Sequence, residues 1–533
     1  MKKGTKSFVQ GAAILAIAGF IVKIIGAFFR IPLLNSIGQI GMSYYEVAYP
    51  YYAWLLVISS SGFPTAISKL VSERVALGDY HGAQAVFKRA LGMLVCIGAV
   101  TAASMFFGAD FLAGITTFEK AALSLRALAP ALLLVSVMCA YRGYLQGMQH
   151  MVGTALSQLA EQVVKLAAGL TLAISWLPRG PEYAAMGALV GVTVSELVAL
   201  IVIVLFYRRE KREFDALLNA RRPTGRGMDN ITHDLLAVAI PITVGASISP
   251  LAGIVDSALI GRILQGTLGY TQEAAQTAFS LLRSNVTTLI NMPGVLTSAL
   301  AMSLVPAISA AMTARDYKSV RTITRLGLKL SFFVGLPCAT GLFVLAEPIL
   351  TLLYTSLDGP DLALAVGLMR TSAVGVLFLS LVQSMTGAIQ GMGKPKVPVL
   401  NLFIGFVLKV VTLLILMRIP RIHIQGAAVS TVVCYAFAGL ANMIYAIRFT
   451  SMKLSLANMV IKPAFASLVM GVAAHFLFIL VAKGGHERTA TLLAVAVGAG
   501  IYLVLLGLLR MFNAEELDMI PGGSKLKKIF YRS

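Results

Sequence analysis

The stretch LRALAPALLLVSVMCAYRGYLQGM, residues 125–148, recurs without gaps as MRTSAVGVLFLSLVQSMTGAIQGM at 369–392. The two copies lie 244 residues apart and share an arginine, a serine and a closing Gln-Gly-Met. A shorter echo joins GDYHGAQAVFKR (78–89) to RDYKSVRTITRL (315–326). We place the second copy of the long repeat six apolar spans after the first. An even number of spans gives both halves the same membrane orientation, so the repeat predicts two parallel bundles of the kind found in transporters.

Apolar residues dominate the chain, with 58% hydrophobic and only 13% charged residues in a length of 533. A soluble protein of this size needs more charge to cover its surface. Apolar runs of about 20 residues, long enough to cross a bilayer, recur throughout. The sequence therefore predicts an all-α polytopic membrane protein with about fourteen transmembrane helices. The predicted spans are 8–33, 45–70, 89–112, 122–146, 152–177, 184–207, 234–262, 275–311, 326–354, 363–390, 397–417, 425–447, 463–482 and 489–510.

The repeat and the spans together predict three parts of the chain. Residues 1–220 form an N-terminal six-helix lobe, 221–450 form a second six-helix lobe, and 451–533 hold helices 13 and 14 and a basic cytoplasmic tail. The apolar run that follows MKKGTK at the N-terminus holds charges and lacks a small-residue cleavage site. We interpret it as a retained first helix rather than a signal peptide.

The distribution of the 44 lysines and arginines predicts the orientation of the chain. With the N-terminus inside, thirty of them fall in inner loops or tails, seven in outer loops and seven within spans. This excess indicates that both termini are cytoplasmic. The net charge of +21, including RREKR (208–212) and KLKK (525–528), is thus explained by topology. A nucleic-acid partner is not expected, because no basic domain lies outside the membrane.

Motifs for cofactors and catalysis are missing from the sequence. The four cysteines are scattered through apolar segments without a CxxC, and the six histidines are dispersed, so we expect no metal site. GAIQGMGKP (387–395) has proline where a phosphate-binding loop needs Ser or Thr, so no nucleotide is expected. Outer loops are short and lack convergent carboxylates. We therefore expect no enzyme activity and no cofactor, and a coupling cation stays an open alternative.

Charged residues inside the spans carry the functional interpretation. Each unpaired charge near the middle of a bilayer costs about 2.5–3.5 kcal/mol on insertion scales. Seven cations against three anions cannot all be paired internally, which predicts a solvated cavity that prefers anions. The cations are Lys23, Arg30, Arg126, Lys165, Arg283, Arg370 and Lys409, and the anions are Glu161, Glu196 and Asp256.

Lys23 and Arg283 are the strongest candidates for substrate binding, because both lie well inside their spans. Lys23 shares one helical stripe with Gly19, Gly26 and Arg30, at spacings of 4, 3 and 4. The other cations have plainer alternatives. Residues near outer span ends can extend their side chains to the interface, which applies to Arg30, Arg126 and Arg370.

The acidic residues have alternatives of their own. Glu161 and Lys165 are four residues apart and are expected to neutralise each other. Glu196 is a possible partner of Lys409, and Asp256 either pairs with a neighbouring cation or takes part in cation coupling. Further acids lie close to the outer boundary and are expected to be wetted, namely Glu46 and Glu347.

Several motifs give the chain a family resemblance over essentially its whole length. They are KIIGAFFRIPLL (23–34), SGFPTAISKLVSE (61–73), YRGYLQGMQHM (141–151), SQLAEQVVK (157–165) and DMIPGGSKLKKIF (518–530). With them the chain resembles the stage V sporulation protein B and MurJ-like lipid II flippases. These form part of the polysaccharide-exporter branch of the multidrug/oligosaccharidyl-lipid/polysaccharide exporter superfamily.

The resemblance implies two six-helix lobes around a central cavity, alternating access, and two extra helices that line a lipid-tail groove. It also implies a basic cavity floor from helices 1, 2 and 8, which Lys23, Arg30 and Arg283 match here. Two departures stand out. Helix 2 offers only Lys69, at its inner end, and Leu282 and Val286 replace the expected acidic neighbours of Arg283.

These observations favour a monomeric flippase in a bacterial cytoplasmic membrane. Its expected partners are membrane lipids and an undecaprenyl-pyrophosphate-linked saccharide such as a peptidoglycan precursor. The alternatives are a drug/cation antiporter of the same superfamily, a membrane-embedded enzyme of envelope assembly, and a non-transporting scaffold. The sequence leaves open which sugar is carried and whether the role is vegetative or linked to sporulation.

Overall fold

The computed structural model describes residues 2–219, 230–452 and 455–511. Within these ranges the chain is built from helices, without a β-strand, as the apolar runs predict. It divides into two compact units, Met1–Ser280 (unit 1) and Leu281–Ser533 (unit 2). The lobe boundary expected after residue 220 lies in the segment 220–229, outside the described residues.

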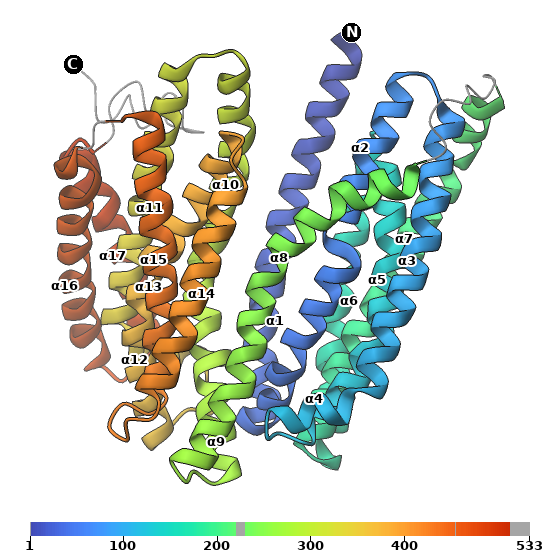
Figure 1. Cartoon of the computed structure of the whole chain (residues 1–533). Coiled ribbons are helices and arrows are strands. Elements are labelled where there is room, and N and C mark those ends of the chain that lie inside the picture. The colour runs from blue at the N-terminus through green and yellow to red at the C-terminus, as the bar shows by residue number, and fades with distance from the viewer. Residues whose placement is uncertain (1, 220–229, 453–454, 512–533) are drawn as a thin grey trace. The chain divides into compact units, whose positions relative to one another are not determined.

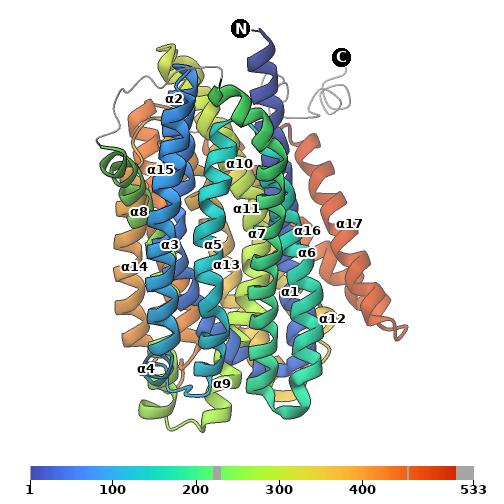
Figure 2. The ribbon, with the colours of Figure 1, turned by 90° about the vertical axis from the view of Figure 1, so that its right-hand side faces the viewer.

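Unit 1 is a bundle in which α5 lies between α3 and α7, and α6 packs along α7 (Figure 2). The first helix, α1, contacts α5, α6 and α7. The helices of unit 1 are α1 (Lys2–Leu56), η1 (Val57–Ser61), α2 (Phe63–Ala76), α3 (Tyr80–Phe107), α4 (Ala109–Ile115), α5 (Ala121–Gly147), α6 (Met151–Trp176), η2 (Leu177–Arg179), α7 (Pro181–Asn219), α8 (Ile231–Arg262), η3 (Ile263–Thr267) and α9 (Gln272–Ser280).

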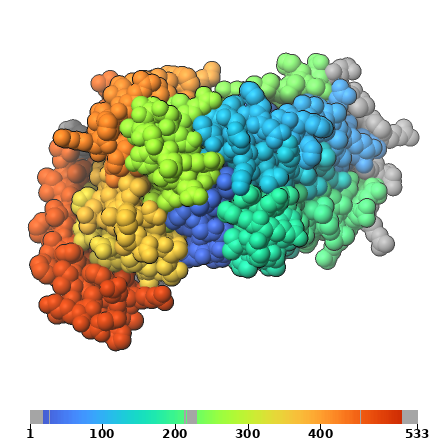
Figure 3. Space-filling view, turned by 90° about the horizontal axis from the view of Figure 1, so that it is seen from below, coloured from blue at the N-terminus to red at the C-terminus, as the bar shows by residue number. Residues whose placement is uncertain are grey.

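Unit 2 is centred on α13, which packs against α10, α11 and α15 (Figure 1). The last two helices, α16 and α17, pair with each other, and α16 also packs on α11. Figure 3 shows them in red and orange beside the yellow atoms around α12. The helices of unit 2 are η4 (Leu281–Val286), α10 (Thr287–Thr313), α11 (Tyr317–Val344), α12 (Ala346–Leu353), α13 (Gly359–Gly391), α14 (Lys396–Leu416), α15 (Gln425–Thr450), η5 (Ala457–Ile461), α16 (Lys462–Ala482) and α17 (Glu487–Leu508).

The predicted membrane spans are present as long apolar helices. Among the described residues, thirteen segments are long and apolar enough to cross a membrane. The first of them, Ala18–Ala76, is 59 residues long and contains a kink at Gly38, where φ is 71°. It contains most of the predicted span 8–33 and the whole of the predicted span 45–70. The protein is therefore a multi-pass membrane protein.

The helix caps reproduce the short repeat of the sequence. Asp79 accepts a hydrogen bond from the backbone N–H of Gly82 and caps the start of α3. Asp316 accepts one from the N–H of Ser319 and caps the start of α11 in the same way. An aspartate side chain at this position satisfies an N–H group that has no partner within its own helix. The repeated Asp-Tyr therefore marks equivalent helix starts in the two units.

Glycine contacts reproduce the long repeat as well. A side chain at Gly98 would meet Ser136 at 2.8 Å, and one at Gly335 would meet Ser380 at 3.2 Å. These glycines are 237 residues apart, and the two serines are the pair matched in the long repeat.

The closing glycines of the repeat behave in the same way. A side chain at Gly147 would meet the carbonyl oxygen of Ser68 at 3.0 Å, and one at Gly391 would meet that of Val305 at 2.9 Å. Equivalent helices thus make the same close approaches in each unit, which confirms the internal duplication.

Two hydrogen bonds, one buried and one partly buried, anchor the C-terminal helix α17 to α11. The Tyr502 hydroxyl donates to the carbonyl of Phe333 over 2.9 Å. The Lys329 ammonium donates to the carbonyl of Met511 over 3.3 Å. Lys329 lies within the predicted span 326–354, and it is buried, with 3% exposure. A lysine at the carboxyl end of a helix supplies a donor to its unpaired carbonyls.

Candidate functional site

Helix α1 brings one cation of the predicted stripe into a fixed ion pair. Arg30 and Glu46 would be about 24 Å apart along a straight helix. The kink at Gly38 instead brings Arg30 Nη1 to 2.8 Å from Glu46 Oε1. Glu46 is 1% exposed, so the expectation that it would be wetted is wrong. Lys23, in contrast, is on an exposed part of α1.

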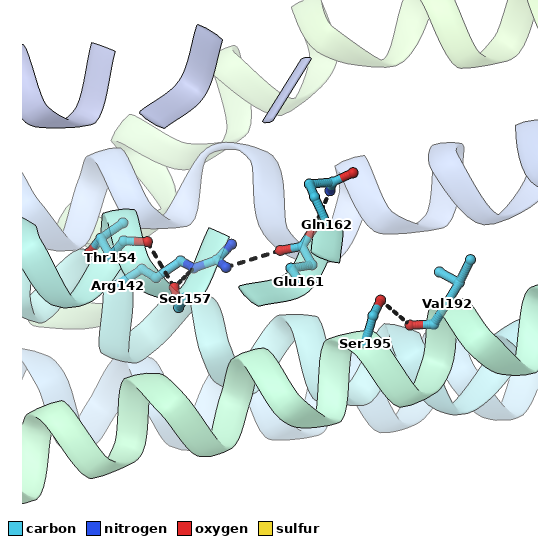
Figure 4. A network of polar contacts seen from close by, with 7 residues as sticks. All are labelled: Arg142, Thr154, Ser157, Glu161, Gln162, Val192 and Ser195. Atoms are coloured by element: carbon cyan, nitrogen blue, oxygen red, sulfur yellow. Dashed lines mark hydrogen bonds and ion pairs between the residues drawn. The ribbon is translucent and has the colours of Figure 1, made fainter. Parts of the chain in front are cut away.

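Glu161 pairs with a cation that the sequence analysis did not single out. Arg142 Nη2 lies 3.0 Å from Glu161 Oε2, and Arg142 Nε donates to Ser157 Oγ over 3.0 Å (Figure 4). Gln162 Nε2 donates to the other oxygen of Glu161 over 3.0 Å. The Arg142 and Glu161 side chains are 12% and 17% exposed, so this ion pair is largely shielded from solvent.

The expected pairing of Glu161 with Lys165 is therefore not what the structure shows. The Lys165 ammonium lies over two aromatic rings, 5.3 Å from the centre of Phe29 and 5.8 Å from that of Tyr49. The Arg30 guanidinium lies 5.6 Å from the centre of the Tyr49 ring as well. Aromatic faces attract cations, most strongly where water is excluded.

Glu196 on α7 completes this group of charges. It is buried, with 6% exposure, and lies within electrostatic range of Glu161, Arg142 and Lys165. We call the whole set the N-terminal polar cluster. Its members are Arg30, Glu46, Arg142, Glu161, Lys165 and Glu196. Three cations face three carboxyl groups, so fixed charges can balance one another inside unit 1.

Sequence reasoning missed Arg142 as a member of this cluster and misjudged the surroundings of Glu46, although signals for both were present. Arg142 lies within the predicted span 122–146, and Glu161 lies within the next span, 152–177. Opposite charges in adjacent spans are candidates for a buried pair. Glu46 similarly follows the predicted turn after helix 1. Only the folded chain shows which of the available partners each residue selects.

In unit 2, Arg283 lies on a polar stripe of the eighth predicted helix. It belongs to the π-helical turn η4, and it is half-buried. Thr287 is half-buried too, and Asn291 is exposed, whereas Ser284, Asn285 and the residues that follow Thr287 up to Ile290 are buried. The accessible face of this apolar helix therefore carries an arginine, a threonine and an asparagine at intervals of four.

The remaining predicted residues are distributed over both units. Arg126 forms an ion pair with Asp110, in which the two side chains are 36% and 70% exposed. Arg370 is exposed on α13, Lys409 is 7% exposed on α14, and Asp256 is 5% exposed on α8. No group of three or more His, Cys, Asp or Glu that could hold a metal ion occurs in the part of the chain that the structure describes.

The family model for polysaccharide biosynthesis proteins matches residues 8–312, more than half of the chain. The chain belongs to this family. A second model, MatE, matches residues 272–415. Together with the helical fold, these matches place the protein among the transporters of the multidrug/oligosaccharidyl-lipid/polysaccharide exporter superfamily, as the resemblance implied.

Three curated proteins of Bacillus subtilis (strain 168) are similar to this chain over nearly its whole length. The uncharacterized membrane protein YabM is 28% identical over 98% of this chain and 96% of its own length. Stage V sporulation protein B is 25% identical over 97% of this chain and 98% of its own. Lipid II flippase MurJ is 26% identical over 94% of this chain and 95% of its own.

Solved structures agree on the fold of the family. An inward-facing multidrug resistance MATE transporter superposes with a TM-score of 0.68, at 16% identity, covering 83% of this chain and 98% of that one. The inward closed conformation of the lipid II flippase MurJ gives a TM-score of 0.65 at 15% identity, covering 93% of this chain and 98% of that one.

Proposed function

We propose that this protein is a flippase for an undecaprenyl-pyrophosphate-linked saccharide, such as a peptidoglycan precursor. It would act by alternating access in the cytoplasmic membrane of a bacterium, with both termini in the cytoplasm. Full-length similarity to a lipid II flippase and to a sporulation protein supports this substrate class. Transport of this kind requires no covalent chemistry.

The observation that carries the proposal is the polar stripe of Arg283, Thr287 and Asn291 on the accessible face of an apolar helix. Placing exposed polar side chains against lipid costs free energy, so this face is better suited to line an aqueous path. An arginine there can bind a phosphate group through two parallel hydrogen bonds, while the neighbouring hydroxyl and amide suit a sugar. Lys23 adds a second accessible cation, in unit 1.

Several other cations of the spans have partners within the protein, and these contacts bear on which residues are proposed to bind the headgroup. Arg30 and Arg142 each have a carboxylate partner within 3.0 Å, and Lys165 lies over aromatic rings. Arg126 is engaged by Asp110. The residues proposed for headgroup recognition are Lys23 and Arg283, which lie on accessible faces, with Arg370 as a further exposed cation and Lys409 as a buried one.

The membrane potential is a sufficient driving force for the proposed transport. Moving a charge across the membrane is worth about 2.3 kcal/mol per 100 mV, so a dianion carried outward gains about 5 kcal/mol when the inside is negative. A coupling cation is the alternative. Its candidate sites are the buried carboxyl groups of Glu196 and Asp256.

Charge reversal tests the proposal. We expect that Lys23→Glu and Arg283→Glu each prevent a labelled lipid-linked sugar from reaching the outer face of the membrane. Both variants should still insert into the membrane. The matched control is Lys318→Glu, which reverses an exposed charge in the first turn of α11. Wild-type flipping in both Lys23→Glu and Arg283→Glu would overturn the proposal. Unchanged flipping after collapse of the membrane potential would refute the driving force alone.

A drug/cation antiporter is the second candidate, favoured by the MatE match at 272–415 and by the multidrug transporter fold. Such a protein needs acidic residues in its substrate-binding site, because they attract a cationic substrate. Arg283→Glu should then raise cation export instead of abolishing flipping. An assembly enzyme would change the covalent structure of the labelled lipid, whereas a flippase changes only its sidedness.

A further inference from the structure

Arg283 lies in a π-helical turn, η4, that spans Leu281–Val286 between α9 and α10. A π-turn closes hydrogen bonds from residue i to i+5 and accommodates an extra residue in the helix. The turn begins at the first residue of unit 2. Single π-turns within α-helices occur frequently at functional sites, so the contacts that maintain this one bear on how Arg283 is presented.

Two hydroxyl groups bind the backbone of the π-turn. The Tyr354 hydroxyl lies 3.4 Å from the carbonyl oxygen of Ser284 and 3.3 Å from that of Asn285. The Thr287 hydroxyl donates to the carbonyl of Leu282 over 2.7 Å. A change of helical register leaves carbonyl groups without their α-helical N–H partners, and buried carbonyls need a donor. Tyr354 supplies one from outside the helix, at the end of α12.

Tyr354 is well placed to hold the turn firmly. Its side chain is among the largest that are fully buried in the described chain, with 1% exposure. The phenol has two side-chain torsions and is enclosed by packing, so little further freedom is lost when the hydroxyl binds. The same ring without the hydroxyl would fill the same space but leave both carbonyls without this donor.

The π-turn also contains buried polar groups that form no hydrogen bond in the helical register that the turn adopts. Asn285 is fully buried, and neither its Nδ2 nor its Oδ1 has a hydrogen-bond partner among the described residues. The Ser284 hydroxyl is 1% exposed and likewise has no hydrogen-bond partner among the described residues. Leaving a buried polar group unsatisfied costs about 1–3 kcal/mol. The register therefore needs an external contact to maintain it.

Register determines the direction of the Arg283 side chain. Removing the extra residue of a π-turn rotates the residues on its two sides relative to each other by about 100°, one residue of an α-helix. Such a rotation would take Arg283 off the stripe that it shares with Thr287 and Asn291. We propose that Tyr354 is a positioning residue, whose hydroxyl holds the π-turn and thereby directs the Arg283 guanidinium toward the phosphate group of the lipid-linked substrate. The substrate part of this inference rests on the proposed function.

Cysteine labelling tests the positioning directly. Arg283→Cys is introduced into a variant without the four native cysteines, and its labelling rate with a water-soluble methanethiosulfonate is measured with and without Tyr354→Phe. Loss of the hydroxyl should change the rate at position 283 about fivefold, the effect of about 1 kcal/mol. Asn291→Cys, beyond the turn, should keep its rate. An unchanged rate at position 283 would overturn the inference.

A matched control separates positioning from general loosening of the fold. Tyr502→Phe removes another tyrosine hydroxyl that binds a backbone carbonyl in unit 2, that of Phe333. It should leave labelling at position 283 unchanged. Equal changes in both tyrosine variants would assign the effect to stability and overturn the positioning role.

The flipping assay then distinguishes this inference from the proposed function. In the otherwise native chain, Tyr354→Phe should raise the KM for the lipid-linked sugar more than it lowers kcat. If labelling at position 283 responds to Tyr354→Phe but Arg283→Glu flips normally, the π-turn is held as proposed and the substrate assignment fails. If Arg283→Glu abolishes flipping while Tyr354→Phe changes neither labelling nor KM, the positioning role fails.

Discussion

The Tyr502 hydroxyl donates a 2.9 Å hydrogen bond to the backbone carbonyl of Phe333, four residues before Pro337. In a regular α-helix the N–H of residue 337 would bind this carbonyl, but proline has no N–H. The proline thus creates an acceptor within α11, and the tyrosine of α17 satisfies it. In an apolar environment such a bond fixes where α17 attaches to the rest of unit 2.

Tyr502→Phe is expected to destabilise the protein by about 0.5–1.5 kcal/mol, because it removes the hydrogen bond from the hydroxyl to the carbonyl of Phe333. A lower Tm of the purified protein in detergent would show this. The additional substitution Pro337→Ala supplies an N–H at that position, so Tyr502→Phe should cost less in the Pro337→Ala background. An equal cost in both backgrounds would contradict the link between the proline and the tyrosine.

The Arg142–Glu161 pair is expected to behave as a buried ion pair. Either Arg142→Met or Glu161→Leu leaves an uncompensated charge and should cost about 3 kcal/mol. The double substitution removes both charges and should be more stable than either single variant. Thermal unfolding of the four proteins gives the coupling between the two residues. Additive losses would show that the charges act independently.

Gly387→Ala is expected to destabilise unit 2 by about 1–3 kcal/mol through overpacking. The added carbon would lie 2.5 Å from the carbonyl oxygen of Ala301, a backbone atom that cannot rotate away. Gly500→Ala is the control, because nothing lies within 4 Å of its added carbon. It should leave the Tm unchanged or raise it slightly. Similar losses in both variants would refute the packing argument.

The cap at Asp316 is expected to weaken in acid. The Ser319 hydroxyl and N–H donate to this carboxylate and hold its pKa below the usual value of 3.8. A lowered pKa means that the stabilisation is complete above pH 3.8 and is lost as the pH falls through the lowered value. Hydrogen-exchange protection of the first turn of α11 should fall accordingly. Asp316→Asn, which caps without titrating, should keep its protection constant over this range.

Asn285→Leu is expected to raise the Tm and impair transport. Both polar atoms of the buried amide lack partners, so an apolar side chain of similar size removes a cost of about 1–3 kcal/mol. If transport requires the π-turn to change its helical register, the variant in which the turn is stabilised should flip the substrate more slowly. A lower Tm would show that the amide gains contacts that outweigh its burial.

The sequence predicted the helical membrane fold because the signals for it are local. Apolar runs longer than the bilayer requires specify spans wherever they occur, and the thirteen candidate spans follow the predicted ones closely. The duplication was also readable, since equivalent positions such as Asp79 and Asp316 perform the same capping function in each copy. Within the segment Ala18–Ala76, the kink at Gly38 separates the two spans that the sequence predicts there.

The partners of the charged residues were less predictable. Sequence spacing favoured Glu161 with Lys165, yet Glu161 binds Arg142 of the neighbouring helix. The spacing of residues along one helix predicts which side chains share a face. It does not predict which residues of other helices pack against that face. The burial of Glu46 beside Arg30 likewise depends on the turn at Gly38.

The sequence alone determined that this chain spans a membrane many times, that it contains a parallel duplication, and that it carries excess positive charge within its spans. Only the tertiary structure decided which carboxylates Arg30 and Arg142 pair with, and that Lys23 and Arg283 lie on accessible faces. The physical reason is range: hydropathy and helical periodicity act over a few neighbouring residues, whereas charge pairing and helix register depend on side chains that the folded chain brings together from distant segments.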